Sequence, residues 1–180
     1  IGPGALQAMA GSIVAISNGI GVYHIYGDET THGEGYNMQQ IPKPQQGLYG
    51  QLTGLMGQSY VLHTPEALRD ALRRGRNAVF HPVKASPFFL MLPINTQPQI
   101  LEVNLAALPE RIELPAPQPP PTAVIANAAH LITRAKRVII KAGGGTRHHA
   151  GALRAFAEVA QAPVVLSPGS TGVLPDAHPL

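Results

Sequence analysis

Three consecutive glycines, Gly143 to Gly145, follow an apolar run that ends at Ala142. An apolar strand that enters a glycine-rich turn and then a helix is typical of nucleotide-binding βαβ units, in which backbone N–H groups can bind a phosphate. The turn does not have the GxGxxG spacing, and no acidic residue follows a second strand about twenty positions on. The pattern therefore predicts an α/β unit. It favours close packing of strand against helix, rather than a bound nucleotide, as the reason for the glycines.

A second glycine turn, Gly2-Pro3-Gly4, precedes a helix-patterned run. Glycine allows another group to approach the backbone closely, and proline stiffens a turn. The residues leave two interpretations open, a turn that lies against a ligand and an ordinary helix entry.

The histidines do not predict a metal centre. His148 and His149 are adjacent, and side chains of neighbouring helical residues point about 100° apart, so they chelate one ion poorly. With Arg147 they predict a surface cluster. His24 lies inside an apolar strand, which favours a core or rim position. Further polar residues lie in the loop that follows this strand: Asp28, Glu29, His32 and Glu34.

Strand and helix patterns alternate in the first half, which predicts a parallel sheet. The pattern predicts helices over 5–18 and 64–74 and strands over 21–26, 59–62 and 88–93. Thr64 is the predicted N-cap of the second helix, with Leu68, Ala71 and Leu72 on its inner face. Residues 30–51 have no sustained period, and we expect a long loop with one short helix.

The second half repeats this order. The pattern predicts strands over 137–142 and 162–166, with a helix through Ala160 between them. A preceding helix, 122–135, carries an apolar stripe made of Ile125, Ala128, Ala129, Ile132 and Ala135. Before it, residues 115–121 are rich in proline, which predicts an extended connector. The fold class predicted is α/β, with two incomplete parallel-sheet, Rossmann-like domains (1–98 and 122–180) joined by a Pro-rich linker (99–121).

Composition narrows the class of protein. Hydrophobic residues make up 44% and charged residues 13% of the chain, which is typical of a globular protein without a membrane span. Cysteine is absent, which excludes disulfides and thiolate metal sites and leads us to expect a cytoplasmic location. No signal peptide is recognisable and the first residue is not Met, so we expect a start inside a longer protein or after processing.

The net charge of +3 does not predict a nucleic-acid partner. The basic residues are scattered apart from four near the end of one predicted helix, where they complement the helix dipole. These four are Arg69, Arg73, Arg74 and Arg76.

Taken together, several segments resemble one enzyme family. The first half contains the Gly2-Pro3-Gly4 turn, a loop with Met38-Gln39-Gln40 after Gly27-Asp28, and a closing strand over 88–95. This combination resembles the thiamine-diphosphate-dependent enzymes of the acetolactate synthase and pyruvate decarboxylase superfamily, whose pyrimidine-binding domain has a GPG turn, a polar pair and a strand of the form PVxLxxPxD. In the second half, 162–165 and 172–180 resemble the central-domain pattern APVVxxxxxxGVLPxxHPL.

This resemblance implies two partial domains. Residues 1–98 would be the C-terminal portion of the pyrimidine-binding domain and 122–180 the N-terminal portion of the central domain. Thiamine diphosphate and Mg²⁺ are the implied cofactors, with most of their ligands outside this chain, because no segment matches the family's activating glutamate or its GDG metal-binding segment. Some members hold FAD or an adenine nucleotide in the central domain, which would place it at Gly143, Gly144 and Gly145.

Gln39 and Gln40 fall where the decarboxylases have a His-His pair and the synthases a Gln-Glu pair. Two neutral amides can orient a 2-oxo acid and its adduct but do not readily supply a proton. The alternative, that both are solvated loop amides, stays open, because this loop also contains Gln45, Gln46 and Gln51.

The function implied by the resemblance is cleavage or formation of a C–C bond adjacent to a carbonyl, by a lyase or transferase acting on a 2-oxo acid or a related small carbonyl compound. Active sites of the family lie between subunits, which implies a homodimer or homotetramer. We expect the 180 residues to be inactive alone. The alternatives are a non-catalytic, Rossmann-like module that binds a nucleotide or a partner, and a central domain with a purely structural role.

Overall fold

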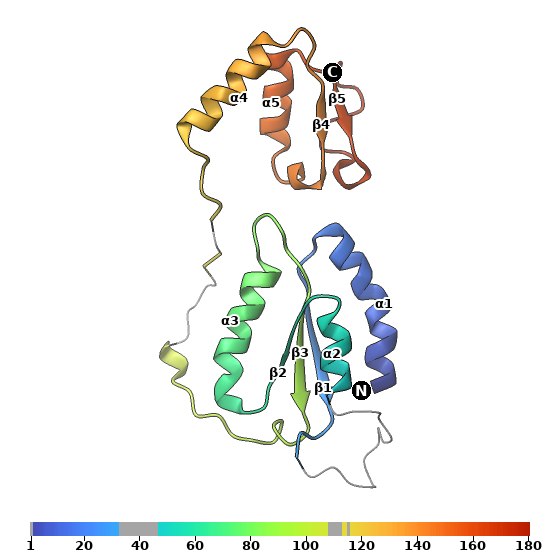
Figure 1. Ribbon diagram of the computed structural model, residues 1–180, viewed down its shortest axis with the longest axis vertical. Coiled ribbons are helices and arrows are strands. Elements are labelled where there is room, and N and C mark those ends of the chain that lie inside the picture. Colours follow the sequence, from blue (N-terminus) through green and yellow to red (C-terminus); the bar gives the residue numbers. More distant parts are fainter. Residues whose placement is uncertain (1, 33–46, 108–112, 115) are drawn as a thin grey trace. The chain divides into compact units, whose positions relative to one another are not determined.

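A computed structural model describes residues 2–32, 47–107, 113–114 and 116–180 of the chain. The chain forms two compact units, unit 1 (Ile1–Ala116) and unit 2 (Pro117–Leu180), and each contains its own small sheet (Figure 1).

The sheet of unit 1 contains three parallel strands in the order β1-β3-β2. These are β1 (Tyr23–Asp28), β2 (Gln58–Val61) and β3 (Phe88–Pro93). The central strand, β3, has the sequence FFLMLP, and its first four residues are fully buried. A strand in the middle of a parallel sheet is covered on both faces, which explains a continuous apolar run in place of an alternating one.

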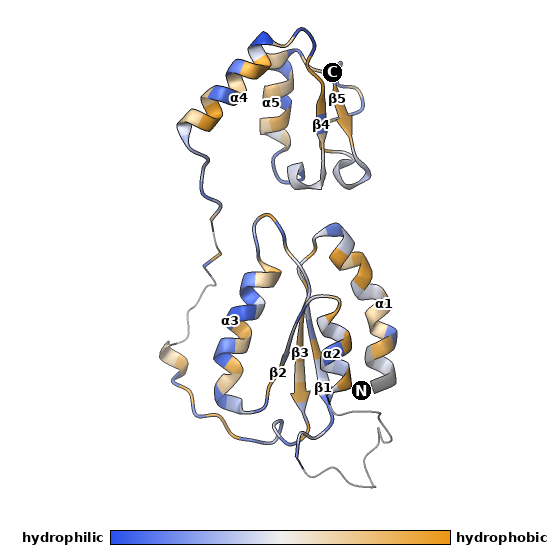
Figure 2. Cartoon of the chain, viewed as in Figure 1, coloured by the Kyte–Doolittle hydropathy of each residue, from blue (hydrophilic) through white to orange (hydrophobic). Residues whose placement is uncertain are grey.

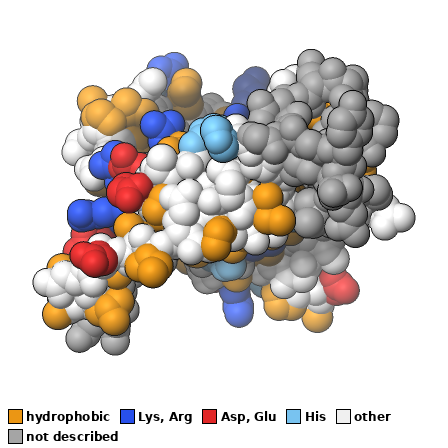
Figure 3. All heavy atoms as spheres, turned by 90° about the horizontal axis from the view of Figure 1, so that it is seen from below, with side chains coloured by type: hydrophobic (Ala, Val, Ile, Leu, Met, Phe, Trp, Pro, Cys, Tyr) orange, Lys and Arg blue, Asp and Glu red, His pale blue; other side chains and the backbone are white. Residues whose placement is uncertain are grey.

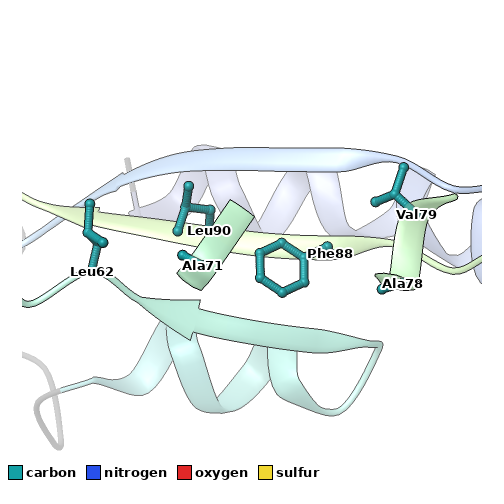
Figure 4. Close-up of a cluster of buried hydrophobic side chains, with 6 residues drawn as sticks. All are labelled: Leu62, Ala71, Ala78, Val79, Phe88 and Leu90. Atoms are coloured by element: carbon teal, nitrogen blue, oxygen red, sulfur yellow. The ribbon is translucent and has the colours of Figure 1, made fainter. Parts of the chain in front are cut away.

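Helices cover both faces of this sheet. They are α1 (Gly2–Asn18), α2 (Leu48–Gly54) and α3 (Leu68–Val79). Successive side chains of β3 point to opposite faces: Phe88 and Leu90 pack with residues of α3, whereas Phe89 and Met91 pack with Tyr49 of α2. Figure 4 shows the cluster on the α3 side. Unit 1 therefore has three layers, with the sheet in the middle.

Two details of α3 differ from the sequence prediction. The helix continues to Val79 instead of ending near Arg74, and Leu72 is 44% exposed rather than on the inner face. Ala71 is buried and Leu68 packs against the core, as predicted, and Gly75 and Ala78 complete the buried face at helical spacing. These small residues allow the helix to lie close to the sheet. Thr64 is the N-cap, as predicted, but it makes no side-chain capping bond, and the first turn, Pro65–Ala67, is a 3₁₀ turn.

Unit 2 contains two parallel strands, β4 (Ile140–Ala142) and β5 (Val164–Leu166), connected through α5 (Ala150–Ala160). Both strands are shorter than predicted. Leu153 and Ala157 of α5 are buried, and the helix ends at Gln161 in the left-handed conformation, with φ 46°. Together the two units confirm the predicted α/β class with incomplete parallel sheets.

The remaining helix, α4 (Thr122–Arg134), has no buried residue. Its predicted apolar stripe is therefore not part of a core. Ile125 and Ile132 line an open groove of about 870 Å³ together with Val138, Phe156 and Val159. Figure 2 shows hydrophobic residues along α4 as well as along the buried β3. No helix in the described part of the chain is both long enough and apolar enough to cross a membrane.

Candidate functional site

Polar residues gather where the three strands of unit 1 end. In parallel α/β sheets, ligands bind outside the carboxyl ends of the strands. Asp28 is the last residue of β1, His63 follows β2, and Asn95 follows β3. Helix α1 begins at this same end of the unit (Figure 1). Figure 3 looks onto this end, where histidine, acidic and basic side chains are visible. We call this region the strand-end site.

The strand-end site contains a hollow of about 300 Å³. It is lined by Asp28, Glu29, Thr30, Thr31, Gly47, Val61 and His63. Asp28 is 3% exposed and Glu29 is 9% exposed. The Glu29 N–H donates to Oδ1 of Asp28 at 2.9 Å. Carboxyl oxygens are hydrogen-bond acceptors, so the hollow suits a ligand that offers hydroxyl or N–H donors.

Hydrogen bonds hold the strand ends together. The Ile94 N–H donates to the Asp28 carbonyl at 3.0 Å, and the Thr31 N–H donates to Oδ1 of Asn95 at 2.9 Å. Thr96 is buried and donates its hydroxyl to the His63 carbonyl at 3.2 Å. Asp28 and Glu29 were predicted from the sequence to border the site, whereas Asn95, Thr96 and His63 were not. The signal that could have found them is a run of polar residues directly after a buried strand.

The glycine turn Gly2-Pro3-Gly4 forms the first turn of α1. A Cβ added at Gly4 would meet nothing within 4 Å in the described chain. No described residue therefore packs against the backbone of this turn at Gly4. The other predicted residues of this site, Gln39 and Gln40, lie outside the described residues.

A serine and a histidine also meet in unit 1, away from the hollow. Ser12 Oγ lies 3.2 Å from Nε2 of His24, and the hydroxyl of Tyr26 lies 3.4 Å from its Nδ1. The His24 ring stacks on Phe89 at a centroid distance of 4.7 Å. Ser12 is only 1% exposed, so it cannot attack a substrate. Burial lowers the pKa of His24 and raises that of Tyr26. His24 is thus the satisfied core or rim histidine that its strand predicted.

In unit 2, the glycines after β4 lead into a short 3₁₀ turn (Gly144–Thr146). The N–H groups of Thr146, Arg147 and His149 donate to backbone carbonyls of the turn itself, so they are not directed at a ligand. A Cβ added at Gly143 or Gly145 would meet nothing within 4 Å in the described chain. The prediction that close packing explains these two glycines is therefore wrong.

Gly144 does lie near another segment. A Cβ added there would lie 3.4 Å from the Gly169 carbonyl oxygen, an ordinary contact distance. None of the three glycines has a positive φ. Neither backbone conformation nor contacts within the described chain therefore require glycine at these positions.

No metal centre forms in the described part of the chain, where no group of three His, Asp or Glu side chains could hold an ion. His148 and His149 are both exposed, as the predicted surface cluster requires.

His178 has a structural position in unit 2. Its side chain is 6% exposed, and Nε2 lies 3.2 Å from Oε1 of Glu158, which also accepts from Arg154 at 2.9 Å. Hydrogen bonds from Arg154 and His178 lower the pKa of Glu158. The Val164 N–H donates to the Leu180 carbonyl at 2.7 Å. These bonds hold the HPL segment (residues 178–180) against α5 and β5. The segment therefore contributes to the folding of unit 2.

Comparison with known proteins shows what the second half of the chain is similar to. Residues 125–180 match the family model described as the thiamine pyrophosphate enzyme central domain. This match confirms the resemblance to the thiamine-diphosphate-dependent enzyme superfamily and includes β4, α5 and β5.

One relative is the acetolactate synthase isozyme 1 large subunit of Escherichia coli (strain K12), which is 29% identical over 122 residues. The matched region is 67% of this chain and 20% of the relative. The chain thus spans about a fifth of the length of the curated relative it matches.

Proposed function

We propose that this chain is part of a thiamine-diphosphate-dependent enzyme that cleaves or forms a C–C bond adjacent to a carbonyl, as an acetolactate-synthase-like lyase or transferase. The observation that carries the proposal is the central-domain match over residues 125–180. The polar strand-end site of unit 1 supports it. The proposed substrate is a 2-oxo acid or a related small carbonyl compound, and the proposed assembly is a homodimer or homotetramer.

The proposal assigns a domain to each unit. Residues 1–98 would be the C-terminal portion of the pyrimidine-binding domain, 99–121 the linker, and 122–180 the N-terminal portion of the central domain. Mg²⁺ would be held by residues outside this chain. When bound, thiamine diphosphate supplies the nucleophilic carbon and the electron sink for such chemistry.

The chain's own residues would bind and orient. The first turn of α1, Gly2-Pro3-Gly4, would lie against the cofactor's pyrimidine ring, where the bare backbone at Gly4 leaves room. Gln39 and Gln40 would hydrogen-bond the substrate's carbonyl or carboxylate oxygens through their amides, without moving a proton.

A nucleotide in unit 2 is a further part of the proposal. No described residue packs against Gly143 or Gly145, so FAD or an adenine nucleotide could approach the bare backbone there. The N–H groups of Thr146, Arg147 and His149 bond within the turn, so they would not bind its phosphates. Calorimetric titration of the chain with FAD and with ADP tests this. Gly145→Val should weaken binding of the nucleotide without changing the unfolding midpoint. If neither FAD nor ADP binds, the proposed nucleotide site in unit 2 is refuted.

The enzyme that contains this chain provides the main test. Product formation from pyruvate and a panel of other 2-oxo acids should require thiamine diphosphate and Mg²⁺. Gln39→Ala and Gln40→Ala should each lower kcat/KM by about tenfold or more, the loss expected when a positioned donor is removed. Gln46→Ala, in the same loop, is the matched control. Turnover that does not depend on thiamine diphosphate would overturn the proposal.

A further inference from the structure

Three consecutive residues after β3 bind the ends of all three strands of unit 1. Ile94 donates its N–H to Asp28 at the end of β1, and Thr96 donates its hydroxyl to His63 after β2. Between them, the Asn95 side chain reaches the segment that continues from β1. Residues 94–96 therefore connect the segments that line the hollow.

Asn95 makes this connection with both the oxygen and the nitrogen of its side-chain amide. Oδ1 accepts from the Thr31 N–H at 2.9 Å and lies 3.2 Å from the Thr30 hydroxyl. Nδ2 donates to the Thr31 hydroxyl at 3.1 Å. Thr30 is buried and Asn95 half-buried, so water competes little for these bonds. An amide that accepts from one group and donates to another restricts both position and orientation.

Charge explains why an amide suits this position. Asp28 and Glu29 already bring two buried carboxyl groups to the hollow. A third carboxylate beside them would add like-charge repulsion. Asn95 provides an acceptor for Thr31 without that charge.

We propose that Asn95 is a positioning residue of the strand-end site. Its amide ties Thr30 and Thr31 to the turn after β3 and thereby fixes the backbone on which Asp28 and Glu29 face the hollow. The effect of Asn95 on catalysis rests on the proposed function. The tie, meaning the hydrogen bonds between Asn95 and residues Thr30 and Thr31, does not.

Amide hydrogen exchange in the 180-residue chain tests the tie. Asn95→Ala should speed exchange of the Thr31 N–H by about tenfold or more, because its acceptor is removed. Asn95→Asp keeps the acceptor but loses the Nδ2 donor and adds a carboxylate, so it should retain part of the protection, between Asn95→Ala and the parent chain. Asn104→Ala is the matched control, because Asn104 is an exposed asparagine whose side chain accepts from the nearby Ala106 N–H and does not contact the strand-end site in the described contacts. Unchanged Thr31 exchange in Asn95→Ala would overturn the proposal.

Kinetics of the enzyme that contains this chain separate positioning from a merely structural role. Asn95→Ala should lower kcat by about tenfold with little change in KM, as expected for a misplaced group, and Asn95→Asp should recover part of kcat. Faster Thr31 exchange with unchanged kcat and KM would overturn the positioning role. If the unsubstituted enzyme has no thiamine-diphosphate-dependent activity, the proposed function fails, while the exchange result still decides whether the tie exists.

Discussion

Gly75 lies where α3 approaches the sheet most closely. A Cβ added there would lie 2.4 Å from Cε1 of Tyr23 and 2.8 Å from Cδ1 of Phe88. We predict that Gly75→Ala lowers the free energy of unfolding of unit 1 by about 1–3 kcal/mol through overpacking. The matched control is Gly11→Ala in α1, where the added Cβ meets nothing within 4 Å in the described chain. That change should be neutral or stabilise by up to about 1 kcal/mol. Urea unfolding measures both, and equal stability of the two variants would contradict the prediction.

His24 makes the stability of unit 1 depend on pH. Burial lowers its pKa in the folded chain, so the unfolded chain takes up a proton first as the pH falls. The contribution of neutral His24 to the free energy of unfolding is therefore complete above the ordinary histidine pKa of about 6.5. It is lost as the pH falls from there towards the lowered pKa of His24 in the folded chain. We predict that His24→Gln reduces the drop in urea midpoint between pH 7 and pH 5. His148→Gln, at an exposed position, should leave the drop unchanged, and identical pH profiles for His24→Gln and the parent chain would refute the prediction.

Among the elements, α4 and α5 differ in what they contribute to unit 2. Ile125 of α4 is exposed in the open groove, whereas Leu153 of α5 is buried. We predict that Ile125→Ser changes the free energy of unfolding by less than about 0.5 kcal/mol, as surface substitutions usually do. Leu153→Ala should cost about 2 kcal/mol or more, because it removes buried methyl groups and leaves a cavity. Chemical denaturation of the two variants provides the comparison, and a large loss in Ile125→Ser would mean that α4 is part of a core.

Most helices and strands were predictable, but their packing was not. The strand over 88–93 was predicted with its observed bounds, because a long apolar run closed by proline is a strong local signal. Ala71 was correctly predicted on the inner face of α3, but Leu72 was wrongly placed there in preference to Gly75 because it is the more hydrophobic residue. Small residues occupy the buried face because they allow α3 to lie close to Tyr23 and Phe88 of the sheet. The stripe of α4 was also apolar, yet no described segment buries it.

The molecule taken as a whole should be inactive alone. In the described part no group of side chains is placed to hold a metal, and no segment matches the activating glutamate or the GDG segment of the family. We predict no conversion of pyruvate by the 180-residue chain with thiamine diphosphate and Mg²⁺. An acetolactate synthase assayed in parallel is the positive control, and measurable turnover by this chain would contradict its proposed status as part of a larger enzyme.

The α/β class and the superfamily resemblance could be inferred from local patterns. Strand and helix periods, glycine turns and the HPL segment are properties of neighbouring residues, and the matches to known proteins confirm the resemblance. The composition of the strand-end site could not be inferred in this way. Asn95 and Thr31 lie 64 positions apart and meet because β3 pairs with β1 in the middle of the sheet. The central position in the sheet goes to the strand that gains most from burial of both faces. That choice depends on all strands and helices of the unit, so no single segment determines it.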